Sequence, residues 1–326
     1  MEINQTVIAK LAGLSRASVS RFVSSNNIPT VSDGNKSKKY SVENTRKIIQ
    51  GVCDLSKKSV TDKVQVFYNF KGGTGKTSLC YQIATHLTLM GYDVLAIDLD
   101  PQGHLSTSMI GEKSIDLPTM YDVLVNGTSI QDTIYPVCSG LNLIPGNLAL
   151  TRLEVPLSQK TKREEILKRV IAPLVGEYDF ILIDTNPTIS TLNMNALAAA
   201  DHVNIVCETQ PFSLSGLGLL LEELKNFGSE MEKSLSYHII ANKYESKTAS
   251  AQEVLGALRS DYKEHMFQSV IRKSEDINIA SKIRLPVSVF ASKRSLAFED
   301  IIDLLHEFLE KFTTDPKDLL GYSVVD

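Results

Sequence analysis

Residues 70–78 read Phe-Lys-Gly-Gly-Thr-Gly-Lys-Thr-Ser, and this glycine-rich stretch decides the fold that the sequence predicts. It ends like the phosphate-binding loop G-x-x-x-x-G-K-S/T, with Gly-Lys-Thr at residues 75–77. Phe70 stands where that pattern has its first glycine, and an additional lysine, Lys71, follows it. The stretch therefore predicts a phosphate-binding loop whose first two residues are unusual.

The residues on either side supply the context that such a loop requires. Residues 64–69 are an apolar run that predicts a strand, and the pattern from Lys76 to about Met90 predicts a helix. Loop glycines let backbone N–H groups converge on phosphate oxygens, the lysine ammonium binds the β- and γ-phosphates, and the threonine hydroxyl can ligate Mg²⁺. A glycine-lysine turn arising by chance would lack this context. We therefore expect ATP or ADP and Mg²⁺ as cofactors.

Strands alternate with helices along the rest of the chain. After the first strand, apolar runs occupy residues 93–100, 178–187, 202–210 and 235–244, and helical patterns such as residues 214–227 separate them. Continuous apolar strands separated by helices are typical of a mostly parallel, doubly wound sheet covered on both faces. Ligands in such α/β folds bind at the carboxyl ends of the strands.

Carboxylates stand at the ends of two of these predicted strands. Asp98 and Asp100 close the run 93–100, and Asp184 follows the apolar residues of the run 178–187. Beside a phosphate loop, one carboxylate can hold Mg²⁺ through water and another can accept a proton from the attacking water. Solvated aspartates in turns after the strands are the alternative interpretation.

Taken together, these stretches resemble the ParA/MinD ATPases. The arrangement KGGTGKT, with its extra lysine, is similar to the deviant Walker A signature of that family, and residues 93–107 are similar to its D-x-D-P-Q-G stretch. The resemblance covers about residues 64–313 and implies the fold of a P-loop NTPase with ATPase activity. In one place the chain departs from the family, since residues 184–187 read Asp-Thr-Asn-Pro instead of D-x-P-P.

The resemblance also implies roles for individual residues. In the family the extra lysine reaches the nucleotide of the partner subunit, so Lys71 becomes a candidate dimer switch; a solvent-exposed loop lysine is the alternative. Asn242 would read the adenine edge through its amide, although an asparagine at a strand end also suits a turn. The implied catalytic residues are Asp100, Lys71 and Lys76, and the implied metal ligands are Thr77, Asp98 and Asp184. The implied nucleotide-binding residues are Lys71, Gly72, Gly73, Thr74, Gly75, Lys76, Thr77, Ser78 and Asn242.

The first 25 residues have the pattern of a helix-turn-helix. Apolar residues form one stripe before Gly13 and a second stripe after Ser15, which suits the N-cap of the second helix. The outer face of that helix presents small polar and basic side chains suited to a major groove. A plain helical hairpin is the alternative. The candidate DNA-binding residues here are Ser15, Arg16, Ser18, Ser20 and Arg21, joined by Lys38 and Lys39 of the segment that follows.

That following segment predicts a basic hairpin around Asp33-Gly34, which could form a wing, and then a helix capped by Ser41. Residues 1–60 contain ten Lys or Arg and four Asp or Glu, whereas the remainder has 24 basic and 34 acidic residues. A basic unit on an acidic body suggests a nucleic-acid partner, with a solvated charged terminus as the alternative. We expect a small α-helical, winged helix-turn-helix domain over residues 1–60, a linker over about 51–62 and a P-loop ATPase domain over 63–326.

The ends of the chain favour one branch of the resemblance. A MinD-like protein would end in a basic amphipathic helix that lies on membrane, but the last predicted helix is acidic, so no membrane partner is expected. Nor do the cysteines stand in the cluster-binding motifs of nitrogenase-reductase-like proteins. Longer plasmid ParA proteins bind DNA without sequence preference through basic residues of the body and repress their own genes through an added N-terminal domain. The candidates in the body are Arg272, Lys273, Lys282 and Arg284, followed by Lys293 and Arg294; a solvated charged face is the alternative.

The sequence thus predicts a DNA-segregating ATPase. ATP would close a homodimer that binds nucleoid DNA, and a ParB-type centromere-binding partner would stimulate an otherwise slow hydrolysis. The runner-up is a transcription regulator that uses the ATPase body only as a nucleotide-dependent dimerisation module. With 43% hydrophobic and 22% charged residues, no secretory signal pattern and four widely spaced cysteines, the composition is that of a cytoplasmic protein without a zinc site or disulfide framework.

Overall fold

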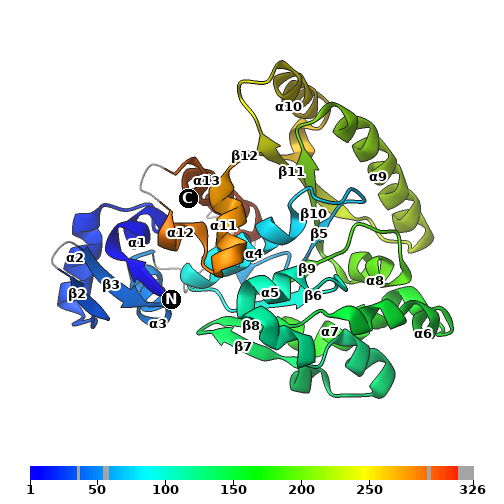
Figure 1. Cartoon of the computed structure of the whole chain (residues 1–326), viewed down its shortest axis with the longest axis horizontal. Helices are drawn as coiled ribbons and strands as arrows, with labels where there is room; N and C mark the ends of the chain where they lie inside the picture. Colours follow the sequence, from blue (N-terminus) through cyan, green and yellow to red (C-terminus); the bar gives the residue numbers. More distant parts are fainter. Residues whose placement is uncertain (35–36, 54–58, 292–294, 315–326) are drawn as a thin grey trace, which may run out of the picture.

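A central sheet of eight strands carries the nucleotide-binding motifs of the computed structural model, which describes residues 1–34, 37–53, 59–291 and 295–314 (Figure 1). The order of the strands is β12-β11-β10-β5-β9-β6-β8-β7, and each neighbouring pair is parallel except β7 and β8. The strands are β5 (Val64–Tyr68), β6 (Val94–Asp98), β7 (Tyr135–Cys138), β8 (Leu141–Ile144), β9 (Phe180–Asp184), β10 (His202–Glu208), β11 (Ser236–Tyr244) and β12 (Met266–Arg272). The predicted α/β fold with a mostly parallel sheet is confirmed.

Helices cover both faces of this sheet, because successive residues of each strand point to opposite faces. Phe67 and Phe180 face the side of α4, whereas Val66 and Ile181 face the opposite core. The helices of the body are α4 (Lys76–Leu89), α5 (His104–Ile110), α6 (Glu154–Ser158), α7 (Ile166–Ile171), α8 (Thr191–Ala199), α9 (Pro211–Glu230), α10 (Ala249–Asp261), α11 (Glu275–Ile283), α12 (Val287–Phe290) and α13 (Leu296–Phe312). Within the described residues, no helix is long and apolar enough to cross a membrane.

The N-terminal unit consists of three helices and a small antiparallel sheet of order β1-β3-β2. Gly13, with φ of +65°, turns the chain between the first two helices, and the Ser15 hydroxyl accepts a hydrogen bond from the Ser18 backbone N–H at 3.1 Å. Ile8, Leu11 and Val19 are fully buried between these helices, as their spacing predicts. The elements are β1 (Glu2–Asn4), α1 (Gln5–Leu11), α2 (Arg16–Ser25), β2 (Ser32–Gly34), β3 (Ser37–Ser41) and α3 (Val42–Cys53).

The predicted hairpin is confirmed, since β2 pairs antiparallel with β3, with Asp33 opposite Lys38 and Gly34 opposite Ser37; residues 35–36 lie outside the described residues. The expected linker over 51–62 is structured in part. Its first residues complete α3, and β4 (Ser59–Val60) pairs with β13 (Thr313–Thr314); residues 54–58 lie outside the described residues.

The N-terminal unit packs directly on the body and shares one continuous hydrophobic core with it. Arg46 of α3 donates to the carbonyl oxygens of Thr88 and Tyr92 at 3.0 and 2.6 Å and pairs with Asp93 at 2.6 Å. These acceptors lie at the C-terminal end of α4, where backbone carbonyls lack partners within the helix. The helix that begins at the phosphate loop therefore ends against the N-terminal unit.

Candidate nucleotide-binding site

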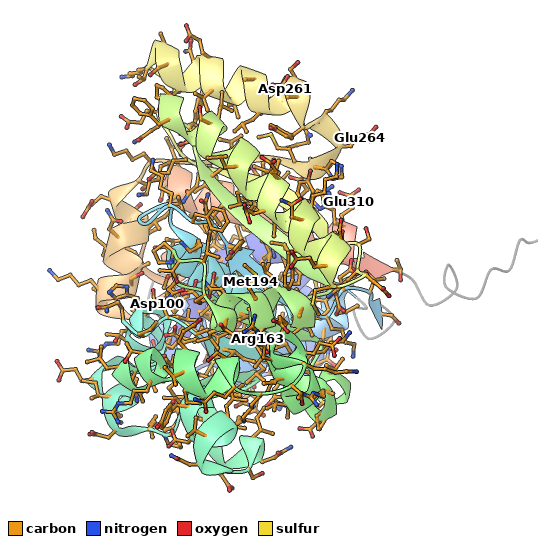
Figure 2. The ribbon with its side chains drawn as sticks, turned by 90° about the vertical axis from the view of Figure 1, so that its right-hand side faces the viewer. Asp100, Arg163, Met194, Asp261, Glu264 and Glu310 are labelled. Atoms are coloured by element: carbon orange, nitrogen blue, oxygen red, sulfur yellow. The ribbon has the colours of Figure 1, made fainter. Side chains whose placement is uncertain are left out.

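A cleft of about 420 Å³ opens at the carboxyl edge of the sheet, beside the phosphate loop. Asp100 lines the cleft and follows β6, and in Figure 2 it lies far from Asp261 and Glu264 near the end of α10. The cleft is therefore at the sheet edge where α/β folds bind their ligands. Its lining residues are Gly73, Gly75, Lys76, Thr77, Ser78, Asp100, Gln102, His104, Thr185, Pro187, Lys243 and Asn278.

The loop between β5 and α4 has a backbone that only glycine accommodates well. Gly73 and Gly75 adopt φ of +76° and +95°, and a Cβ atom at Gly75 would lie 2.3 Å from Asn242 Nδ2. Phe70, in the place of the missing first glycine, packs edge-on against Tyr68 with ring centroids 5.5 Å apart. Phe70 thus packs against the strand before the loop and does not line the cleft.

Thr77 and Asp184 form a pair at the base of the cleft. The Thr77 hydroxyl donates to Asp184 Oδ2 at 2.7 Å, while Asp184 Oδ1 is buried without a hydrogen-bond partner. Burial and the neighbouring Asp98 raise the pKa of Asp184 well above its usual range. A buried carboxylate oxygen without a partner, next to a hydroxyl oxygen, fits the hard oxygen ligands that Mg²⁺ prefers.

Lys76 reaches into the same part of the cleft from the first turn of α4. Its side chain is buried, and its ammonium donates to the backbone carbonyl of Lys71 at 3.3 Å. Burial lowers the pKa of Lys76, while the charges of Asp184 and Asp100 oppose that shift. The cation and the two carboxylates predicted from separate stretches of sequence are therefore brought together.

Asp98 and Asp100 have different surroundings. Asp98 is fully buried and accepts hydrogen bonds from the Ser106 backbone and hydroxyl at 2.8 and 2.6 Å and from the Asp100 backbone at 3.1 Å. Burial raises its pKa to about 6. Asp100 lines the cleft, and its Oδ1 accepts the Gln102 backbone N–H at 2.9 Å. Asp100 therefore lines the cleft, whereas donors of its own loop occupy the Asp98 carboxylate. The role of Asp98 as a metal ligand stays a prediction.

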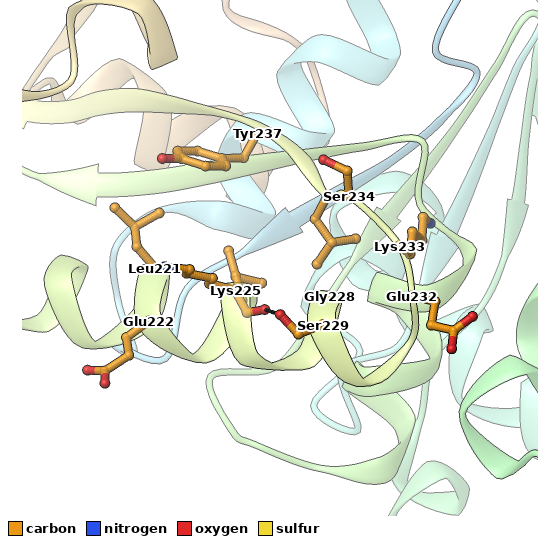
Figure 3. A pocket seen from close by; sticks show the side chains of 11 residues that line it. Leu221, Glu222, Lys225, Gly228, Ser229, Glu232, Lys233, Ser234 and Tyr237 are labelled. Carbon is orange, nitrogen blue, oxygen red and sulfur yellow. Dashed lines mark hydrogen bonds between the residues drawn. The ribbon is translucent and has the colours of Figure 1, made fainter.

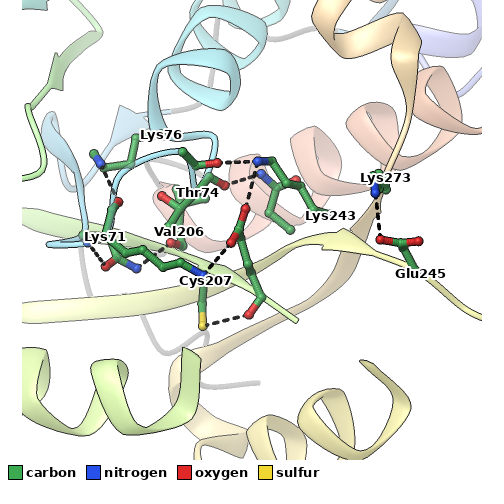
Figure 4. A network of polar contacts seen from close by, with 12 residues as sticks. Lys71, Thr74, Lys76, Val206, Cys207, Lys243, Glu245 and Lys273 are labelled. Atoms are coloured by element: carbon green, nitrogen blue, oxygen red, sulfur yellow. Dashed lines mark hydrogen bonds and ion pairs between the residues drawn. The ribbon is translucent and has the colours of Figure 1, made fainter. Parts of the chain in front are cut away.

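Two charged residues beside the phosphate loop, Glu208 and Lys243, were not found from the sequence. Glu208, the last residue of β10, pairs with Lys71 and with Lys243, both at 2.8 Å. Figure 4 shows Lys71 and Lys243 in one polar network with the phosphate loop, where Lys243 also donates to the Gly73 carbonyl. A charged residue that ends an otherwise apolar strand was the available signal for Glu208, because that position meets the ligand edge of the sheet.

Asn242 lies behind the phosphate loop and is not among the residues that line the cleft. Its Nδ2 donates to the Thr74 carbonyl at 2.7 Å, and the side chain is buried. In this arrangement the amide nitrogen of Asn242 supports the loop. An adenine base would therefore contact the amide oxygen of Asn242, or it would replace the hydrogen bond to Thr74. Its reading of adenine stays a prediction.

The departure from D-x-P-P after Asp184 has a visible local structure. The amide of Asn193 donates to the carbonyl and side chain of Asn186 at 3.0 and 2.7 Å and to the Thr188 carbonyl at 2.6 Å. Thr185 donates to the Phe67 carbonyl at 2.7 Å. Asn186 stands where the D-x-P-P pattern has its first proline. Hydrogen bonds thus hold the turn at a position where a proline would restrict the backbone.

The candidate DNA-binding residues fall into free and paired groups. Arg16 and Arg21 are exposed on α2, and Lys282 and Arg284 are exposed at the end of α11. Four others have partners: Ser15 is the N-cap that Ser18 contacts, Ser20 accepts from Gln5 at 2.6 Å, and Lys39 pairs with Glu2 at 3.3 Å. Lys38 is exposed, whereas Lys293 and Arg294 lie outside the described residues.

Arg272 and Lys273 are already neutralised by carboxylates. Arg272 binds the buried Asp300 through two guanidinium nitrogens, and Lys273 pairs with Glu245 at 2.9 Å. A cation held in an ion pair must break that pair before it can bind a phosphate. The sequence pattern could not reveal this, because both acidic partners are 28 positions away.

A larger cavity, of about 750 Å³, lies between α9 and the start of β11 (Figure 3). Leucines and Tyr237 line it together with Lys225 and Lys233. Lys233 donates to the Ala198 carbonyl at 2.9 Å and also to that of Ala200, at the end of α8, so its charge serves the fold. The phosphate loop and its aspartates do not line this cavity, whose two carboxylates are Glu222 and Glu232.

The fold and the cleft define a P-loop nucleotide-binding protein of the α/β class. Residues 62–237 match the protein family described as an AAA domain. The chain is 34% identical to the chromosome-partitioning ATPase Soj of Treponema pallidum (strain Nichols), over 70% of this chain and 90% of that one. It is 28% identical to the chromosome partitioning protein ParA of Myxococcus xanthus (strain DK1622), over 75% and 87%.

The fold of this chain is also similar to that of a solved structure. The putative plasmid partition protein of Borrelia burgdorferi B31 bound to AMPPNP superimposes with a TM-score of 0.65 at 25% identity, covering 77% of this chain and all of that one. The chain therefore belongs to the ParA family of ATPases.

Proposed function

We propose that this chain is a DNA-partition ATPase in which ATP and Mg²⁺ close a homodimer that binds DNA. The observation that carries the proposal is the placement of two lysines at one phosphate loop. Lys76 is buried in the cleft of its own subunit, whereas the Lys71 side chain is 43% exposed at the rim. A cation at the rim is available to a nucleotide bound by a second copy of the chain.

Each side chain of the cleft then has a distinct task. The backbone N–H groups of the loop and Lys76 bind the phosphates. Thr77 and Asp184 would hold Mg²⁺, which neutralises developing charge on the phosphates when it is bound. Asp100 orients the attacking water and accepts its proton. Asp98 acts on this step by fixing the loop of Asp100.

Hydrolysis is expected to be slow without a partner. Among the described residues, no arginine lines the cleft, so none is placed to stabilise the charge of the transition state there. We propose that a ParB-type centromere-binding protein stimulates hydrolysis and thereby releases the dimer from nucleoid DNA in the cytoplasm.

Two surfaces are proposed for DNA. Lys282 and Arg284 contact DNA without sequence preference, and dimerisation doubles these contacts, which raises affinity steeply through counterion release. The N-terminal unit acts as a winged helix-turn-helix domain, with Arg16 and Arg21 facing an operator whose binding represses the partition genes.

Variants of the two lysines test the dimer switch. Lys76→Ala should lower ATP affinity about 100-fold, because it removes the buried charge-assisted contact to the phosphates. Lys71→Ala should retain monomer ATP binding and lose ATP-dependent dimerisation, measured by light scattering with and without ATP. A Lys71→Ala chain that still dimerises with ATP would refute the switch.

Loss of a plasmid that lacks this gene separates the two candidate functions. A partition ATPase predicts plasmid loss in dividing cells, whereas a regulator that uses ATP only to dimerise predicts misregulated expression with stable inheritance.

A further inference from the structure

Glu208 lies between two lysines of the nucleotide site. One carboxylate oxygen is 2.8 Å from Lys71 Nζ and the other is 2.8 Å from Lys243 Nζ. The side chain of Glu208 is 8% exposed, while the side chains of Lys71 and Lys243 are 43% and 39% exposed. The Glu208 carboxylate is therefore buried, whereas the two lysines that contact it have partly exposed side chains.

Glu208 is ionised at neutral pH in this environment. Burial raises the pKa of its carboxyl group, but the hydrogen bonds and charges of Lys243 and Lys71 outweigh burial and leave the pKa lowered. The contact with Lys71 is consequently a true ion pair, and it is strengthened by the partial exclusion of water around Glu208.

The pair competes with the task assigned to Lys71. An ammonium group bound to Glu208 of its own subunit must exchange that partner for phosphate oxygens when it reaches the nucleotide of a second subunit. A triphosphate carries more negative charge than a diphosphate and offers the γ-phosphate oxygens to an incoming cation. The exchange is therefore more favourable when the partner holds ATP.

We propose that Glu208 is a specificity-determining residue that restrains Lys71 within its own subunit until the partner's ATP displaces it. The inference rests on the proposed function, since it assumes that Lys71 binds the partner's nucleotide. Lys71 must give up its ion pair with Glu208 to enter the dimer. The dimer is therefore favourable only when the contact of Lys71 with the partner's phosphates outweighs that ion pair, which makes dimerisation depend more strongly on the γ-phosphate.

Lys243 makes such an exchange possible without leaving a bare buried charge. When Lys71 leaves, Glu208 keeps its ion pair with Lys243, which is itself anchored on the Gly73 carbonyl. An isolated buried carboxylate is strongly unfavourable because it has lost its hydration, and the pair with Lys243 avoids that state.

The test compares Glu208→Gln with Glu245→Gln. The glutamine at position 208 keeps the shape of the side chain and removes its charge. Glu245 is the control, because it directly follows the last residue of β11, as Glu208 ends β10, and it also pairs with a lysine, Lys273 at 2.9 Å, but does not touch the phosphate loop. Thermal unfolding checks that both variants fold, and light scattering then gives the ATP concentration at the midpoint of dimerisation.

The midpoint should fall about fivefold or more in Glu208→Gln, and in Glu245→Gln it should stay within about twofold of the wild-type value. An unchanged or higher midpoint in Glu208→Gln would overturn the inference. A wild-type chain that does not dimerise with ATP at all would instead contradict the proposed function.

Binding of ADP to the monomer supplies a second readout. The ADP affinity of the monomer should change less than the dimerisation midpoint does in Glu208→Gln, because Lys71 does not serve the nucleotide of its own subunit. If ADP affinity rises as much as dimerisation does, Glu208 acts through Lys243 on its own site, and the assignment to Lys71 is wrong.

Discussion

At the scale of single residues, the two aspartates that end the segment 93–100 have different surroundings. Asp98 has both oxygens occupied by backbone and hydroxyl donors of its own loop, whereas Asp100 lines the cleft. Two chemically identical side chains thus acquire different properties from the groups that surround them.

Asp100→Ala should lower phosphate release about 100-fold or more, because it removes the group that accepts the proton of the attacking water. ATP binding should persist, since Lys76 and the loop remain, and the ATP dimer should stay on DNA. Asp116→Ala is the matched control, because Asp116 is exposed and does not line the cleft. Undiminished phosphate release would show that another group is the base.

His86 is a second residue whose environment makes a measurable prediction. It is fully buried in α4, donates from Nδ1 to the Gln82 carbonyl at 2.6 Å, and has a pKa lowered to about 4 by burial. As the pH falls below about 6.5, His86 therefore binds a proton in the unfolded chain but stays neutral in the folded chain. This histidine contributes stability above that pH and loses it as the pH falls toward 4.

His86→Gln should reduce the pH dependence of the free energy of unfolding between pH 6.5 and 4. One histidine contributes up to about 1.4 kcal/mol per pH unit. Urea unfolding at a series of pH values measures the slope, and His104→Gln, which changes an exposed residue of α5, is the control. Equal slopes in both variants would contradict the prediction.

At the scale of elements, α4 connects the phosphate loop to the N-terminal unit. It begins at Lys76 in the phosphate loop and ends beneath Arg46 of α3. The Arg46 side chain is 11% exposed and binds two carbonyls and one carboxylate at the end of α4. Its charge complements the negative end of the helix dipole.

Arg46→Ala should therefore lower the free energy of unfolding by about 3 kcal/mol, since it leaves three polar partners without their donor. Lys47→Ala, which removes an exposed lysine from the same helix, should change it by about 0.5 kcal/mol or less. Urea unfolding compares the two variants with the wild type. Equal, small effects would mean that Arg46 does not hold the N-terminal unit on the body.

At the scale of the whole molecule, the two proposed DNA surfaces belong to different parts of the chain. Figure 1 shows α2 at the outer side of the N-terminal unit, whereas α11 lies on the body. A molecule with two separate surfaces can bind an operator and the bulk of the nucleoid through different side chains. Mutations should consequently separate the two activities.

Arg16→Ala with Arg21→Ala should abolish operator binding and retain ATP-dependent binding to DNA of arbitrary sequence. Lys282→Ala with Arg284→Ala should do the reverse and reduce the salt dependence of nonspecific binding by roughly one ion per lost phosphate contact. Binding measured over a range of salt concentrations checks both. Loss of both activities in either double variant would show that the surfaces are not independent.

The sequence predicted the parts of the molecule that depend on neighbouring residues. The phosphate loop, the strands before it and after it, helix α4 and the caps at Ser15 and Ser41 all follow from patterns a few residues long. Turn geometry, capping and periodicity are local, so a single sequence suffices to recognise them. The sequence by itself therefore determined the fold class and the residues that form the phosphate loop.

Only the tertiary structure decided which charged side chains form ion pairs within the chain and which do not. Glu208 meets Lys71 across 137 positions, and Arg46 meets Asp93 across 47, while Arg272 and Lys273 are neutralised by carboxylates 28 positions away. Whether a charged side chain serves a ligand or the fold depends on the partner that packing brings within about 3 Å and on the water that burial removes. Local sequence encodes neither quantity, because the sheet brings these residues together only after the chain has folded.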